Sequence, residues 1–177
     1  MTWRRGTSVV GALALPSLVL ASGCRDPVRD DLATSLGGEA PGVKAGPLHR
    51  PGQPCMACHE GDGPGEIVFS IAGTAYQSSE ATVPLANAIV NVIDSTGKRA
   101  LTGTNCAGNF WFVPEDFTPV YPVWTSIEFG GVKSPMNSPI FRDGSCATCH
   151  TDPPAPESAG HVFFAPQPLP FPDDGCP

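Results

Sequence analysis

Two pentapeptides of the same pattern, Cys-x-x-Cys-His, are the residues of this chain best suited to chemistry. They occupy residues 55–59 and 146–150. Two thiols three residues apart lie on one turn of chain, where both can form thioether bonds to the vinyl groups of one porphyrin. The histidine that follows, His59 or His150, then supplies the proximal ligand of the iron. The sequence therefore predicts two covalently bound haem c groups, attached through Cys55, Cys58, Cys146 and Cys149.

Two other kinds of site use paired cysteines. Four cysteines from the two motifs could hold one zinc ion, or each pair could be a thioredoxin-like dithiol. Neither site needs a histidine directly after both pairs, and export to an oxidising compartment disfavours free thiols. We therefore favour two haems and keep the four-cysteine zinc site as the main alternative.

The second axial ligand of each iron has three candidates. His49 lies six residues before the first motif, Met136 lies ten residues before the second, and His161 follows His150 by eleven. Each of the three could instead have a plain packing or surface role. We reject Met56, because it lies inside the first motif. A methionine ligand raises the reduction potential relative to two histidines, so the two haems could differ.

The N-terminal residues 1–23 are typical of an export signal. Arg4 and Arg5 precede a largely apolar run at residues 9–20, which is too short to span a membrane. Residues 20–24 resemble a bacterial lipobox, which predicts lipidation of Cys24 and a mature chain that begins there. The alternative is an ordinary cleaved signal with an incidental cysteine. We expect Sec export, with the protein anchored to a bacterial membrane and facing the periplasm or the cell surface.

Charge and composition exclude several classes of function. The chain has 10 Lys and Arg against 17 Asp and Glu, and both basic residues of the signal are lost on cleavage, which leaves 8 against 17 and a mature net charge of −9. Such a surface repels nucleic acid and can attract a basic protein partner. The sequence has no nucleophile elbow and no phosphate-binding glycine loop. We expect an electron carrier with redox protein partners, no small-molecule substrate and no enzyme activity; a peroxidase-like activity would need an open iron coordination site.

Two cysteines remain after the lipid and haem assignments, Cys106 and Cys176. Outside the cytoplasm a disulfide between them is favoured over two unrelated free thiols. Closing a loop of about 70 residues would stabilise the fold by roughly 4 kcal/mol through chain entropy.

The 20 Gly and 21 Pro make long helices improbable. Short apolar and β-branched runs separated by turn residues predict a mainly β fold, a small antiparallel β-sandwich flanked by irregular haem-binding segments with few or very short helices. An even number of strands would return the chain to its starting end and bring the two motifs close. The expected segments are a tether (24–48), the first haem-binding segment (49–66), the sandwich (67–134), the second haem-binding segment (135–162) and a Pro-rich tail (163–177).

Two resemblances add to this interpretation. Residues 73–76, 84–92 and 108–112 resemble the prealbumin-like carboxypeptidase-regulatory sandwich, which implies a fold and little about function. Residues 49–54 before the first motif, and Met136 ahead of residues 144–146, make the chain similar to a group of small bacterial dihaem lipoproteins. That resemblance implies electron transfer. The competing class is a surface-anchored binding or scaffold lipoprotein whose haems or zinc site are structural or sensory.

Overall fold

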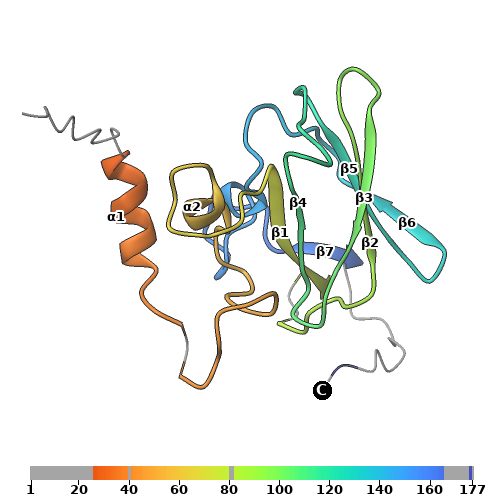
Figure 1. Cartoon of the computed structure of the whole chain (residues 1–177). Helices are drawn as coiled ribbons and strands as arrows, with labels where there is room; N and C mark the ends of the chain where they lie inside the picture. Colours follow the sequence, from red (N-terminus) through yellow and green to blue (C-terminus); the bar gives the residue numbers. More distant parts are fainter. Residues whose placement is uncertain (1–25, 40, 80–81, 166–175, 177) are drawn as a thin grey trace, which may run out of the picture.

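The computed structural model describes residues 26–39, 41–79, 82–165 and 176 (Figure 1). The predicted export signal and the lipidation site Cys24 lie outside these residues. The described elements are α1 (Pro27–Ser35), α2 (Met56–His59), β1 (Ile71–Ser78), β2 (Ile89–Ile93), β3 (Arg99–Gly103), β4 (Asn109–Phe112), β5 (Trp124–Phe129), β6 (Val132–Pro135), the 3-10 turn η1 (Cys146–Thr148) and β7 (Val162–Ala165). This confirms the expected mainly β fold with few, short helices. Within the described ranges, no helix is both long and apolar enough to cross a membrane.

The strands form two sheets that pack face to face. One has the order β4-β1-β7 and the other the order β3-β2-β5-β6. All pairs are antiparallel except β1 with β7. Alternation builds the core between the sheets: on β2, Val90 and Val92 are buried, whereas Ile89, Asn91 and Ile93 are not. The predicted antiparallel β-sandwich is therefore present, with one parallel strand pair.

β1 is buried on both of its faces along most of its length. Ile71 and Ala75 belong to the core between the sheets. Thr74 and Tyr76 alternate with them and point to the opposite face, where they bond to residues from the two cysteine motifs' segments. The three-stranded sheet thus separates the sandwich core from a second, outer layer of chain.

The second motif lies in a loop between two segments that both pair with the same edge of β1. Ala72 forms a parallel bridge with Ser145, just before the motif, and Ala75 pairs with Val162, just after it. The sandwich therefore takes a strand from residues 162–165, beyond the range 67–134 expected for it. The aromatic residues of this strand are packed, as Phe164 is buried.

The segment expected to be a tether contains a helix that rests on the first motif. Asp26 caps α1 by accepting a hydrogen bond from the amide of Val28 at 3.0 Å, and Pro27 occupies the first turn. Arg29 forms a salt bridge with Glu60 at 2.8 Å, directly after the first motif. Figure 1 shows α1 beside α2, in agreement with the contacts between them.

The remaining cysteine pair is joined as predicted. Cys106 and Cys176 form a disulfide with an S–S distance of 2.06 Å across a sequence separation of 70. It fastens the end of the chain to the turn that precedes β4.

Candidate functional site

Both cysteine motifs adopt the same backbone turn. The amide of His59 donates to Cys55 O at 2.9 Å, and the amide of His150 donates to Cys146 O, also at 2.9 Å. Each motif is therefore one helical turn, and this turn carries both cysteines and the histidine. The sequence prediction that each pair of thiols shares one turn is met at both places.

The two motif histidines are also oriented in the same way. His59 Nδ1 lies 2.7 Å from the carbonyl oxygen of Ile67, and His150 Nδ1 lies 2.8 Å from that of Gly160. A carbonyl oxygen only accepts hydrogen bonds, so Nδ1 is the donor in both rings, and in the neutral tautomer this leaves the lone pair on Nε2. This is the tautomer that a histidine needs when it binds a metal through Nε2.

A loop after each motif makes this orientation possible. In the first motif the amide of Gly65 donates to Cys58 O at 2.7 Å, and in the second the amide of Ala159 donates to Cys149 O at 2.8 Å. The first loop needs glycine, because a Cβ on Gly65 would lie 2.5 Å from His59 Nδ1. The loops after the two motifs thus make the same backbone hydrogen bond to the second cysteine of the motif, although the motifs are far apart in the sequence.

An aromatic stack holds the His59 ring against the sandwich. The ring lies on Phe69 with centroids 4.2 Å apart and planes 16° apart. Phe69 in turn stacks on Trp111 of β4 at 5.6 Å. Sequence reasoning missed Phe69 and Trp111 as site residues, because only the pairing of β1 with β4 brings them together.

The two motifs lie side by side on the three-stranded sheet (Figure 1). A Cβ on Gly73 of β1 would lie 2.8 Å from Cys146 Sγ, and the Tyr76 hydroxyl donates to Asp152 Oδ2 at 2.9 Å. The loop before the first motif reaches the same strand, since the amide of Gly52 donates to Thr74 Oγ1 at 2.8 Å. Among the described residues, six strands separate the motifs in sequence, and this even number returns the chain to its starting end.

Burial sets the state of the first thiol in each motif. It raises the pKa of Cys55 to about 11 and that of Cys146 to about 12, and the charge of each motif's neighbouring cysteines acts in the same direction. These thiols are protonated at neutral pH. A thioredoxin-like dithiol requires a first cysteine with a lowered pKa, so the direction of both pKa shifts is opposite to what that alternative needs.

A cavity of about 520 Å³ lies between the first motif and the segment that enters the second. The cavity is lined by Met56 of the first motif, by Glu60 directly after that motif, and by Tyr121 and Asp143. None of the four motif cysteines and neither motif histidine lines this cavity. The two thiols and the histidine of each motif are the residue types that hold a covalently bound haem.

The three candidate second ligands have different surroundings. His49 lies beside His59, with ring centroids 5.9 Å apart. His161 is buried, stacks on Tyr76 at 4.2 Å, and its Nε2 lies 3.0 Å from Asp152 Oδ1. Met136 follows β6 on the other sheet, where its amide donates to Thr125 O at 3.0 Å.

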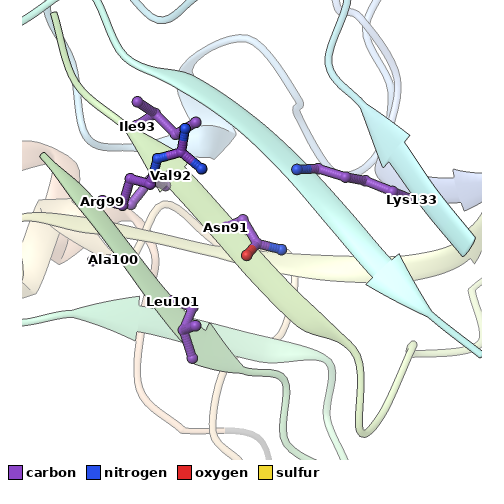
Figure 2. Close-up of a pocket in the computed structure, with 7 residues that line it drawn as sticks. All are labelled: Asn91, Val92, Ile93, Arg99, Ala100, Leu101 and Lys133. Atoms are coloured by element: carbon purple, nitrogen blue, oxygen red, sulfur yellow. The ribbon is translucent and has the colours of Figure 1, made fainter. Parts of the chain in front are cut away.

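Among the described residues, no group of three or more His, Cys, Asp and Glu side chains is arranged to hold a metal ion. A separate groove of about 340 Å³ lies on the outer face of the four-stranded sheet. Figure 2 shows Arg99 and Lys133 on either side of Asn91 there. Asn91 Nδ2 is buried and has no hydrogen-bond partner among the described residues.

Comparison of the chain with protein-family models, curated proteins and solved structures found no match.

Proposed function

We propose that this chain is an extracytoplasmic, lipid-anchored dihaem c-type cytochrome that transfers single electrons between periplasmic or membrane-associated redox proteins. The observation that carries the proposal is the shared design of the two motifs. In each, a helical turn presents two thiols and a histidine whose Nδ1 is bonded to a carbonyl 2.7 or 2.8 Å away. A histidine that served only packing would not require this hydrogen bond from Nδ1, yet the bond is present at both motifs.

The residues that would hold the two haems are those of the motifs. Cys55 and Cys58 would bond the first and Cys146 and Cys149 the second, with His59 and His150 as proximal ligands. A bound haem c supplies one-electron iron chemistry. The carbonyls of residues 67 and 160 increase the basicity of the two imidazoles through their Nδ1 protons.

The placement of the motifs supports electron transfer rather than two separate sensory sites. The second motif contacts β1, since a Cβ on Gly73 would meet Cys146, and the loop that leads to the first motif donates from Gly52 to Thr74 of the same strand. Besides burial, the charge of Cys55 also acts on Cys146 and helps to raise its pKa, so the two motifs are close in space. Cofactors bound at two neighbouring motifs can exchange electrons with each other, so an electron could enter at one motif and leave at the other.

The charge of the chain supports a basic protein as partner. After cleavage of the signal, the chain has 17 acidic residues and 8 basic ones. An acidic surface steers a basic partner toward it, and this steering weakens as salt rises. We expect the rate of electron exchange with a basic redox protein to fall as ionic strength increases.

A second candidate function is that of an anchored binding module. The groove of Figure 2 favours it, because Asn91 presents an unsatisfied amide nitrogen between two cations and beside Leu101. A partner would then bind the four-stranded sheet, and the motifs would be structural.

Paired variants of the mature chain separate the two functions. The chain is produced in a host with haem-maturation machinery, and haem is measured per protein by pyridine haemochrome absorbance. We expect two haems for the parent and one each for Cys55→Ala/Cys58→Ala and Cys146→Ala/Cys149→Ala. The Asn91→Ala variant is the matched control and should keep both. No haem in the parent, in a host that matures a control cytochrome, would remove the proposal and leave the binding module.

A further inference from the structure

We infer that His49 is the second axial ligand of the iron at the first motif, opposite His59. The inference rests on the proposed function and adds to it the ligand set of one haem. That haem would be coordinated by two imidazoles, and its iron would have no open position for a small molecule.

The two rings have the separation that a shared metal requires. Their centroids are 5.9 Å apart and their planes are inclined by 70°. An imidazole nitrogen binds a metal at about 2 Å, so two imidazoles on opposite sides of one metal have ring centres about 6 Å apart. The centroid separation of His49 and His59 meets this condition.

The protonation pattern of His49 matches that of His59. Its Nδ1 lies 3.0 Å from Glu39 Oε1, and among the described residues its Nε2 has no hydrogen-bond partner. A carboxylate that accepts from the far nitrogen is a common second partner of a metal-binding histidine, because it fixes the tautomer and increases the basicity of the ligand. Glu39 is itself held by Arg50 Nε at 3.1 Å.

The backbone of His49 is fixed to the same sheet that holds His59. Asn109, at the start of β4, is buried and donates from Nδ2 to His49 O at 2.8 Å. Its Oδ1 accepts from Thr74 Oγ1 at 2.7 Å. Asn105 donates to Pro47 O at 2.6 Å in the turn that carries the disulfide. Two strands and a cross-link thus position a histidine that lies in a loop.

The other candidates lack this combination. The Nε2 of His161 is 3.0 Å from Asp152 Oδ1, and Met136 lies on the four-stranded sheet. The geometry therefore distinguishes His49 from the two other candidates that the sequence left open.

The test compares the mature dihaem protein with its His49→Ala variant by electron paramagnetic resonance in the oxidised state. We expect the variant to keep two haems by mass while one of its two irons changes from low spin to high spin and binds carbon monoxide after reduction. Added imidazole should return that iron to low spin. The neighbouring Leu48→Ala, half exposed at 50 %, is the matched control and should leave both irons unchanged.

Glu39→Gln tests the positioning role of the carboxylate. It keeps an oxygen for Arg50 and removes the negative charge next to Nδ1, so both irons should stay low spin while the midpoint potential of one haem rises. An unchanged potential would remove Glu39 from the account.

The outcomes are distinguishable from a failure of the proposed function. Two haems with both irons low spin in His49→Ala would overturn the assignment of His49 and leave the dihaem proposal intact. A parent protein without haem would overturn both. If the His49→Ala variant has lost haem, it is produced again with imidazole added during maturation. If the haem then returns and its iron has the same spin state as in the parent without bound imidazole, His49 serves folding and the assignment is wrong.

Discussion

Tyr76 on β1 donates its hydroxyl hydrogen to Asp152 Oδ2 at 2.9 Å, which ties the loop of the second motif to the sheet that carries the first. Asp152 also faces His161, whose ring stacks on Tyr76. Burial, and then Asp152, raises the pKa of Tyr76, so the tyrosine remains a donor throughout the neutral range.

Tyr76→Phe removes this hydrogen bond to a carboxylate. We expect a loss of about 1.5–3 kcal/mol in the free energy of unfolding, because such bonds contribute about that much and Asp152 loses a partner in a partly buried place. Urea unfolding measures the change. Tyr121→Phe is the control, since no hydrogen bond to the Tyr121 hydroxyl exists among the described residues; equal losses in both variants would contradict the account.

Gly65→Ala should disturb the first motif alone. The added Cβ would lie 2.5 Å from His59 Nδ1 and 2.8 Å from Cys58 O, so the loop must move and the bond between His59 and Ile67 must lengthen. Overpacking of this kind costs about 1–3 kcal/mol. Thermal unfolding measures it, with Gly38→Ala as control, because a Cβ on Gly38 meets nothing within 4 Å. A Gly65→Ala protein as stable as Gly38→Ala would show that the loop is not tightly wrapped.

Acid should weaken the turn between β2 and β3. Hydrogen bonds from Thr96, together with backbone amides that include Val120, lower the pKa of the Asp94 carboxyl below 3.8 against the opposing effect of burial. Because the folded pKa is below the unfolded one, Asp94 stabilises the fold above about pH 4 and loses this effect as pH falls through the folded pKa.

Asp94→Asn therefore should be less stable than the parent at pH 7, and the difference between the two should narrow below about pH 4. Melting temperatures from pH 2 to pH 7 test this. The exposed Asp116→Asn serves as control. A gap between parent and Asp94→Asn that stays constant across the range would exclude the ionised form of Asp94 as the cause.

Loss of the disulfide should loosen the turn that holds His49. The loop of 70 residues closed by Cys106 and Cys176 contributes roughly 4 kcal/mol by chain entropy. We expect the free energy of unfolding of the Cys106→Ala/Cys176→Ala variant to be lower by roughly 4 kcal/mol. Its midpoint of urea unfolding should therefore lie at a lower urea concentration than that of the parent. Reduction of the parent protein should give the same midpoint; a parent insensitive to reductant would contradict the cross-link.

Much of the fold could be predicted because its strands alternate locally. The residue types at 123–129 alternate along the sequence, with Val123, Thr125, Ile127 and Phe129 at every second position, and β5 occupies Trp124–Phe129. α1 could not be found in this way, because it buries none of its side chains and so leaves no apolar period in the sequence. Its only local signal was Asp26 followed by Pro27, an N-cap pair with many other uses.

The candidate site divides in the same manner. The motif residues follow from spacing, since a turn is a local structure. The stack of Phe69 on His59 and the approach of His49 depend on β4 and on the amide of Asn109, which lie 40 or more residues away in the sequence. Spacing left His49, Met136 and His161 all open as second ligands, and only the pairing of strands separates them.

The intact mass of the mature protein after denaturation tests the central claim most directly. The protein is released from membranes of a host that matures a control cytochrome, unfolded, and weighed alongside a haem-stained denaturing gel. The account predicts a mass increased by two haems, and by one in the Cys55→Ala/Cys58→Ala variant. A denatured chain that carries no haem mass would contradict it.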